Sequence, residues 1–161
     1  MLERRIGFIG AGQMATALAQ GLLTAGFTTP EKLIASDPSA DARERFAQLT
    51  GARTTEDNAE VAVEVEVVFL SVKPQRLAEV MRGLGGKVPE GTLVVSIAAG
   101  TRLKTLAEGL GARTRLVRVM PNTPCLVGQG ASGYCLGEHA TADDGKLVGR
   151  LLSAAGVAVE V

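Results

Sequence analysis

Near its start the chain reads Gly7-Phe8-Ile9-Gly10-Ala11-Gly12-Gln13-Met14-Ala15, which contains the pattern G-x-G-x-x-A. An apolar run precedes it and an amphipathic segment follows, so it is predicted to join a buried strand (5–9) to a helix (12–25). In such a turn the first glycine permits a tight bend, and the second lets the backbone approach a pyrophosphate. Free N–H groups and the helix dipole favour an anion there. With this context the pattern predicts a dinucleotide-binding turn, and a purely structural glycine-rich turn is the alternative.

The rest of the chain alternates short apolar runs with longer amphipathic segments. Further strands are predicted at 33–36, 65–71, 92–97, 115–120, 131–136 and 157–161, and further helices at 40–48, 75–82, 101–109 and 141–155. Thr141 and Asp144 form a capping-box pattern at the start of the last helix. Alternating strands and helices favour parallel strands joined by crossover helices. The predicted fold is therefore α/β: one Rossmann-type doubly wound domain, residues 1–161, with a mainly parallel sheet and helices on both faces.

Composition excludes several classes of function. Lys plus Arg and Asp plus Glu number 17 each, and aromatic residues make up 3%, so neither nucleic acid nor an anionic membrane is an expected partner. No apolar run approaches the roughly 20 residues of a membrane helix, and the first residues lack the apolar region of a secretory signal. The two cysteines, Cys125 and Cys135, have no metal-ligand spacing. We therefore expect a cytoplasmic protein with reduced thiols and no metal site.

The second predicted strand ends in Ser36-Asp37-Pro38. An acidic residue at this place commonly binds the ribose hydroxyls of NAD, whereas a 2′-phosphate favours Arg, Ser or Thr. Ser36 could serve such a phosphate, and Asp37 would repel it. Asp37 could also be a helix N-cap with Pro38 at the first helical position, and the two roles are compatible. The sequence leaves the choice between NADH and NADPH open.

Three later loops follow predicted strands, where ligands of open parallel sheets bind. They read Ser71-Val72-Lys73-Pro74, Ala98-Ala99-Gly100 and Pro121-Asn122-Thr123-Pro124. Pro74 favours a helix start, Lys73 adds a charge, the small residues of the second loop permit backbone contact with a flat ring, and Asn122 offers an amide in a rigid loop. The structural alternatives are a solvated lysine, helix–strand packing and an Asx turn.

Together these motifs resemble the pyrroline-5-carboxylate reductase family, and their order and spacing fit over essentially the whole chain. The segment from Met120 to Gly130 is the most specific, whereas many Rossmann enzymes share the first motif. The resemblance implies NAD(P)H-dependent reduction of the cyclic imine 1-pyrroline-5-carboxylate to L-proline in proline biosynthesis. The family most often uses NADPH, and Asp37 departs from an ideal phosphate site.

The resemblance also implies site residues. The pyrophosphate would lie against Ile9, Gly10, Ala11, Gly12, Gln13 and Met14, and the adenosine against Ser36, Asp37 and Asn58. The rest of the cofactor would lie against Ser71, Val72, Lys73, Pro74, Ala98, Ala99 and Gly100, with Asn122 near the nicotinamide. No catalytic residue is assigned, and Asn122 and Lys73 are the candidates.

The family has a second, all-helical domain that forms the dimer and carries most substrate-binding residues, and these 161 residues do not include it. We therefore expect a cofactor domain that binds nucleotide and turns over substrate poorly or not at all. The full-length protein is expected to form a homo-oligomer through the helical domain. The alternatives are another Rossmann reductase, of the β-hydroxyacid dehydrogenase or deazaflavin-dependent NADP reductase type, and a non-catalytic nucleotide-sensing module.

Overall fold

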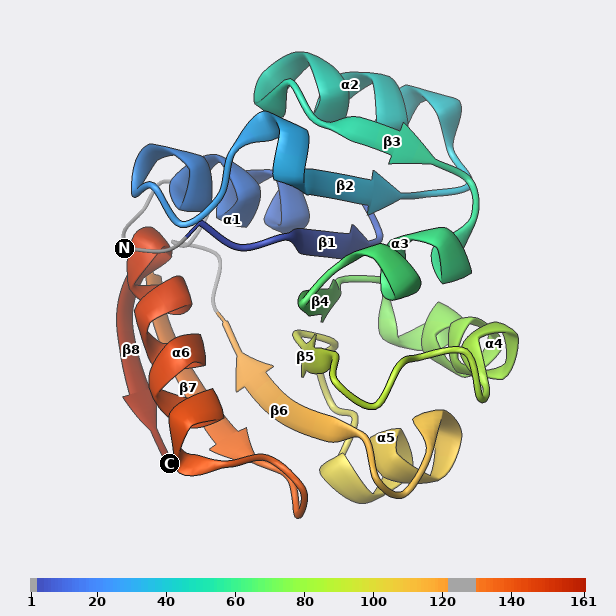
Figure 1. Cartoon of the computed structure of the whole chain (residues 1–161), viewed down its shortest axis with the longest axis vertical. Helices are drawn as coiled ribbons and strands as arrows, with labels where there is room; N and C mark the ends of the chain where they lie inside the picture. Colours follow the sequence, from blue (N-terminus) through green and yellow to red (C-terminus); the bar gives the residue numbers. More distant parts are fainter. Residues whose placement is uncertain (1–2, 122–129) are drawn as a thin grey trace.

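The computed structural model describes residues 3–121 and 130–161. Within them, one eight-stranded sheet has the order β3-β2-β1-β4-β5-β6-β7-β8 (Figure 1). The strands are β1 (Ile6–Ile9), β2 (Leu33–Ser36), β3 (Arg53–Thr55), β4 (Val67–Leu70), β5 (Leu93–Ser96), β6 (Arg115–Met120), β7 (Gly130–Leu136) and β8 (Gly156–Glu160). Strands β1 to β6 are parallel, β7 runs antiparallel to β6, and β8 is parallel to β7. The prediction of a mainly parallel sheet is confirmed.

Helices cover both faces of this sheet, as predicted. They are α1 (Gln13–Thr24), α2 (Ala40–Thr50), α3 (Asn58–Glu64), α4 (Pro74–Leu84), α5 (Leu103–Leu110) and α6 (Ala142–Leu152), with the short 3₁₀ helices η1 (Pro30–Lys32) and η3 (Ser153–Ala155). Apolar residues of α1, α2 and α6 join one buried cluster, and those of α3, α4 and α5 join a second. Each face of the sheet therefore has its own core, as in a doubly wound fold. None of the helices in the described ranges has the length and apolar character needed to cross a membrane.

The central strands are buried on both faces because both are covered. In β4, Val67 and Phe69 belong to the first cluster, and Val68 and Leu70 to the second. Phe69 stacks on Phe8 of β1 with 4.9 Å between ring centroids. This packing holds β1 and β4 side by side, so the loops that follow them also lie together.

The capping box predicted at the start of α6 is confirmed, and it has a second function. The Thr141 hydroxyl accepts from the Asp144 N–H, while Asp144 Oδ2 accepts from the Thr141 N–H at 2.9 Å. The Asp144 carboxylate, which is 5% exposed, also pairs with Arg115 of β6, with 3.0 Å from Arg115 Nε to Oδ2. Burial raises the pKa of Asp144, but the bonds from Arg115 and Thr141 outweigh burial and lower it overall. The ion pair therefore fastens α6 to the sheet.

Besides the short 3₁₀ helix η1, two elements were not predicted, β3 and α3. The strand has three residues, Arg53-Thr54-Thr55, at the edge of the sheet, and the helix has seven. Neither carries a long apolar pattern, although Asp57 and Glu60 have capping-box spacing at the start of α3. Because these elements lie beside the end of β2, their omission left part of the site unseen.

Candidate functional site

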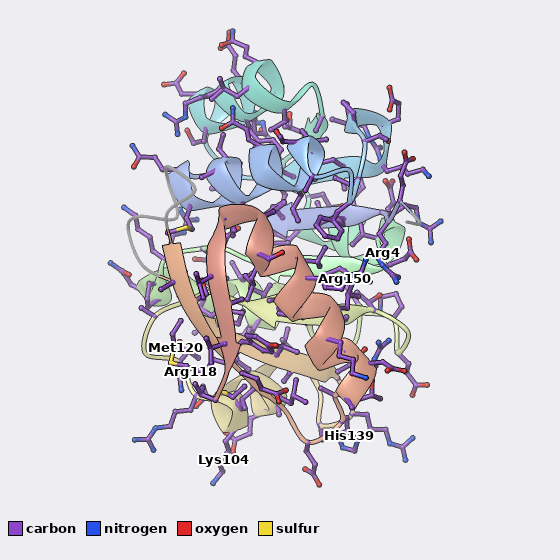
Figure 2. All side chains as sticks on the ribbon, turned by 90° about the vertical axis from the view of Figure 1, so that its left-hand side faces the viewer. Arg4, Lys104, Arg118, Met120, His139 and Arg150 are labelled. Atoms are coloured by element: carbon purple, nitrogen blue, oxygen red, sulfur yellow. The ribbon has the colours of Figure 1, made fainter. Side chains whose placement is uncertain are left out.

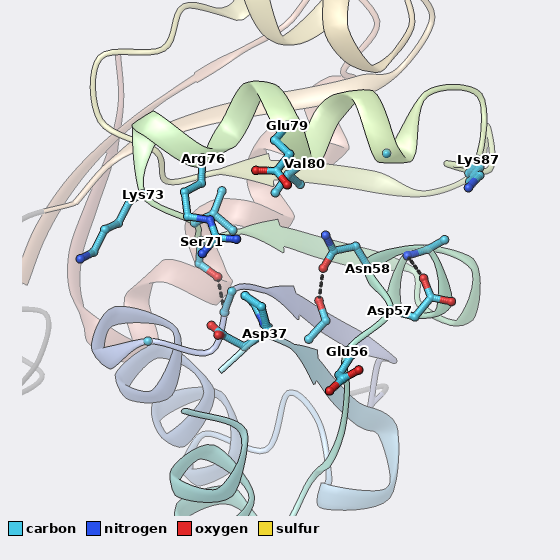
Figure 3. Close-up of a pocket in the computed structure, with 17 residues that line it drawn as sticks. Asp37, Glu56, Asp57, Asn58, Ser71, Lys73, Arg76, Glu79, Val80 and Lys87 are labelled. Carbon is cyan, nitrogen blue, oxygen red and sulfur yellow. Dashed lines mark hydrogen bonds between the residues drawn. The ribbon is translucent and has the colours of Figure 1, made fainter. Parts of the chain in front are cut away.

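The topology creates a crevice between the loops that follow β1 and β4. The chain proceeds outward from β1 to β2 and β3 and then returns to place β4 on the other side of β1. The helices after β1 and β4 therefore cover opposite faces, which leaves an opening at the carboxyl ends of the strands. A cavity of about 690 Å³ lies there (Figure 3), a volume in the usual range for small-molecule sites. Its lining residues are Gly10, Gly12, Ser36, Asp37, Pro38, Glu56, Asp57, Asn58, Ala59, Ser71, Val72, Lys73, Arg76, Glu79, Val80, Gly83 and Lys87.

Gly10 is required by the fold itself. Its φ of +102° disfavours any side chain, and a Cβ atom there would lie 2.7 Å from the Ser71 carbonyl oxygen. The Ser71 hydroxyl donates to the Gly10 carbonyl at 2.7 Å, and the Ser71 N–H donates to the Ile9 carbonyl at 2.8 Å. The turn after β1 is therefore held against the loop after β4.

Gly12 differs from Gly10 in both respects. Its φ of −79° suits any residue, and a Cβ atom there would meet nothing within 4 Å. Packing and backbone conformation therefore do not require a glycine at this position, which lies at the start of α1 and lines the cavity. Close approach of a ligand to the backbone explains why a side chain would be unfavourable here.

Two of the helices that begin at the cavity, α1 and α4, have N-terminal ends that no side chain of the described residues caps. Side chains cap α2, α3 and α6, through Ser39, Asp57 and Thr141. Within the described part of the chain, no side chain caps α1 or α4, whose N-cap residues are Gly12 and Lys73. Their first-turn N–H groups and positive dipole ends consequently face the crevice, an arrangement that favours a phosphate group.

Asp37, after β2, is held by two backbone donors. Its Oδ2 accepts from the Ala11 N–H at 2.9 Å, and its Oδ1 accepts from the Ser39 N–H at 2.9 Å. The prediction that Asp37 is a helix N-cap with Pro38 at the first helical position is wrong. Ser39 caps α2 instead, with its hydroxyl accepting from the Ala42 N–H at 3.2 Å. The carboxylate of Asp37 is instead fixed at the edge of the cavity.

Ser36 and Asn58 act as a pair beside Asp37. The side chain of Ser36 is fully buried, and its hydroxyl donates to Asn58 Oδ1 at 2.7 Å. Asn58, the first residue of α3, is half-buried and lines the cavity. The pair fixes the orientation of the Asn58 amide and leaves its nitrogen to donate elsewhere (Figure 3).

The structure separates the residues that sequence reasoning grouped together. Those that line the cavity are Gly10, Gly12, Ser36, Asp37, Asn58, Ser71, Val72 and Lys73. Ile9, Ala11 and Ala98 are buried in the two cores, whereas Gln13, Met14 and Pro74 belong to the first turns of α1 and α4. Ala99 and Gly100 are exposed beyond β5. Asn122 lies outside the described residues.

Sequence reasoning missed two groups of residues that line the cavity. The first is Glu56, Asp57 and Ala59, around the start of α3, and the second is Arg76, Glu79, Val80, Gly83 and Lys87, along α4 and just beyond it. The spacing of the second group by three or four residues is that of one helix face, so the face itself could have been predicted. Its position opposite α3 depends on the tertiary fold. In residues 3–121 and 130–161, no cluster of three or more His, Cys, Asp and Glu side chains is placed to hold a metal ion.

Comparison with known proteins places this arrangement in a family. Residues 5–100 match the family described as NADP oxidoreductase coenzyme F420-dependent. The chain is 42% identical over 161 residues to a pyrroline-5-carboxylate reductase of Methanosarcina acetivorans, and the match covers all of this chain and 60% of that protein.

Two solved structures agree with this match. A pyrroline-5-carboxylate reductase from Coxiella burnetii has a TM-score of 0.91 at 32% identity, covering 99% of this chain and 59% of that one. The pyrroline carboxylate reductase of Plasmodium falciparum, solved with NADP bound, has a TM-score of 0.87 at 31% identity, covering 100% and 58%. This chain therefore spans about 60% of the length of such relatives. The chain belongs to the NADP oxidoreductase family matched by residues 5–100, and it corresponds to the amino-terminal part of the pyrroline-5-carboxylate reductases.

Proposed function

We propose that this chain is the NAD(P)-binding Rossmann domain of a pyrroline-5-carboxylate reductase, which reduces the C=N bond of 1-pyrroline-5-carboxylate to give L-proline. Gly12 is the observation that carries the proposal. It is a glycine that neither conformation nor packing requires, at the uncapped start of a helix, on the wall of a cavity at the strand-order reversal. A dinucleotide phosphate fits this combination, because it needs close backbone approach and free N–H donors.

The proposed dinucleotide extends along the crevice and beyond it. Residues 9–14 would hold the pyrophosphate, with Asp37 and Asn58 at the adenosine end. The loops 71–74 and 98–100 would border the nicotinamide half, and Asn122 is proposed to lie near the ring. The proposed cofactor is NADP(H) or NAD(H).

Reduced nicotinamide supplies a hydride to the imine carbon, while a proton goes to the nitrogen. The work of this chain is then to fix the ring against the substrate and to keep water out. Lys73 is exposed at the start of α4 and lines the cavity, and in Figure 3 its side chain extends away from the adenosine end. Together with Asn122, it is the proposed contact nearest the reacting groups.

The relatives extend beyond the part that this chain matches, and the family resemblance implies an all-helical domain there. We further propose that this domain binds the substrate and forms the homo-oligomer in the full-length protein. An uncovered apolar sheet face supports this. On β8 and just after it, Val157, Val159 and Val161 are 65%, 56% and 73% exposed, and Met120 of β6 (Figure 2) is 42% exposed. Large exposed apolar patches commonly mark contact surfaces, so the proposed helical domain could pack against these residues.

Turnover measurements test this proposal. The full-length protein is expected to reduce 1-pyrroline-5-carboxylate with NADH or NADPH, and this chain alone is expected to bind nucleotide with little or no turnover. Activity of the full-length protein on a β-hydroxyacid or a deazaflavin instead would support the other Rossmann reductases. Nucleotide binding with no reductase activity at all would support a sensing module. A cytoplasmic location is part of the same proposal, and fractionation of cells would test it.

A further inference from the structure

We infer that the adenosine end of the cavity selects a dinucleotide without a 2′-phosphate, so that NADH is preferred to NADPH. The inference rests on the proposed function and adds a specificity-determining residue, Asp37. In this fold the adenosine ribose lies at the end of β2, where Asp37 stands. This inferred preference for NADH differs from the cofactor of the Plasmodium falciparum relative, whose structure was solved with NADP bound.

The Asp37 carboxylate is ordered and available to a ribose. Each oxygen already accepts one backbone N–H, from Ala11 and from Ser39, both at 2.9 Å. A carboxylate oxygen has a second acceptor site, so both oxygens can still accept from a ribose diol. None of the ion pairs among residues 3–121 and 130–161 involves the Asp37 carboxylate.

Arg43, a basic side chain in contact with Asp37, is bonded to a backbone carbonyl and to a carboxylate. Arg43 donates from Nη1 to the Asp37 carbonyl at 2.8 Å, and its Nη2 lies 3.3 Å from Glu56 Oε1. Its side chain is 19% exposed and is not part of the cavity wall. A 2′-phosphate would have to draw Arg43 away from the acid that neutralises it.

The other cations of the cavity come from a different side. Lys73 and Arg76 belong to the start of α4, and Lys87 follows that helix, whereas Asp37 and Glu56 lie across the cavity below it; the Arg76 side chain extends from α4 into the cavity toward Ser71 (Figure 3). Asp37 and Glu56 are the carboxylates at the ribose end, and a carboxylate attracts a diol as a hydrogen-bond donor and repels a phosphate.

The hydroxyl that could have served a 2′-phosphate is unavailable. Ser36 is fully buried, and its proton is donated to Asn58 Oδ1. Reorienting it toward a phosphate would leave the Asn58 oxygen without that donor. Sequence reasoning left Ser36 and Asp37 as competing determinants, and the geometry favours Asp37.

The test is calorimetric titration of the full-length protein with NADH and with NADPH at one fixed ionic strength. NADH should bind about 10- to 100-fold more tightly, the effect of one hydrogen bond to a charged acceptor. Equal or tighter binding of NADPH would overturn the inference while leaving the proposed function intact. Failure of both nucleotides to bind would overturn the proposed function and the inference with it.

Two variants separate charge from structure. Asp37→Asn removes the charge and keeps one acceptor, for the Ala11 N–H, while the exposed Ser39 N–H loses its side-chain acceptor, so the NADH preference should fall about 10-fold. The matched control is Asp41→Asn, the same chemical change at an exposed site outside the cavity wall, and it should leave the ratio unchanged. An Asp37→Asn protein that is folded and keeps the full preference would overturn the role given to this carboxylate.

Discussion

Replacing Gly12 by valine should abolish nucleotide binding while leaving the fold almost unchanged. The φ of −79° at Gly12 is accessible to valine, and a Cβ atom there meets nothing within 4 Å. The new side chain would instead project into the space where the phosphates are proposed to lie. The structure thus predicts a loss of binding without a loss of stability.

The magnitudes follow from separate effects. Valine is a poorer N-cap residue than glycine by up to about 1 kcal/mol, and replacing glycine restricts the unfolded chain by about 0.4–1 kcal/mol, so the two effects nearly cancel. Excluding the phosphates from the N–H groups of α1 removes at least two hydrogen bonds to a charged group, each about 1.5–3 kcal/mol. Affinity should therefore fall by at least about 100-fold.

Gly10→Ala is the matched contrast, because the same motif contains both glycines. Its φ of +102° and a Cβ atom 2.7 Å from the Ser71 carbonyl oxygen require strain or displacement. We expect a loss of about 2–4 kcal/mol of unfolding free energy, from an unfavourable conformation together with a steric clash. The melting temperature should then fall by roughly 5–15 °C for a chain of this size.

Thermal melts by circular dichroism and calorimetric titration with NADH would compare the two variants with the unsubstituted protein. The reasoning is refuted if Gly12→Val binds nucleotide with unchanged affinity, because the turn after β1 would then not be the phosphate site. It also fails if Gly10→Ala is as stable as the unsubstituted protein, because the close contact between the two loops would then carry no energetic cost.

Three further substitutions test the supports of the site and fold. Asp144→Ala should cost about 3 kcal/mol, because it leaves the partly buried Arg115 without its partner. The pKa of Asp144 is lowered in the folded state, so the stability contributed by its carboxylate is complete above about pH 4 and is lost as the pH falls through the lowered pKa. Urea unfolding at several pH values would therefore show that the stability difference between Asp144→Ala and the unsubstituted protein shrinks in acid. Thr141→Ala should cost about 1 kcal/mol at any pH where the protein is folded, through the lost cap, and an unchanged urea midpoint would contradict that. Ser71→Ala should cost about 1 kcal/mol of stability and weaken nucleotide binding several-fold, because the Ser71 hydroxyl no longer binds the Gly10 carbonyl. A thermal melt measures the first effect and a nucleotide titration the second, and an unchanged result in either would contradict the prediction.

Strands with mainly apolar residues were predictable, and the bounds of β2 (Leu33–Ser36) and β6 (Arg115–Met120) agree with the predicted ranges. Burial on both faces imposes such runs, so the signal lies within the strand itself. Edge strand β3, with Arg53 exposed and two threonines half-buried, needs no apolar run and gives no signal. The sequence of such an edge strand therefore does not predict it, and the strand is recognised only from its pairing with the neighbouring strand, here β2.

The site divides in the same way. Gly10 and Gly12 could be predicted because a few consecutive residues make the turn, with its helix immediately after. The N-cap, one of the two roles left open for Asp37, is wrong because Ser39 caps α2. The bond from the Ala11 N–H to Asp37 Oδ2 could not be predicted, because Ala11 is 26 residues away along the chain and local pattern does not reveal such a donor. The ion pair between Glu56 and Arg43 could not be predicted either, because it depends on β3, which brings the start of α3 beside the end of β2.

The bond between Asp37 and Ala11 joins two parts of the site that sequence patterns treat separately. The carboxylate proposed to bind the ribose also fixes the turn proposed to meet the pyrophosphate, and Ser71 fixes the same turn from the opposite side. The turn is thus held by side chains from both neighbouring strands before any ligand arrives, which lowers the cost of ordering it on binding. A substitution of Asp37 that removes both acceptors should therefore weaken both dinucleotides, whereas Asp37→Asn, which keeps one acceptor for the Ala11 N–H, should act mainly on the choice between them.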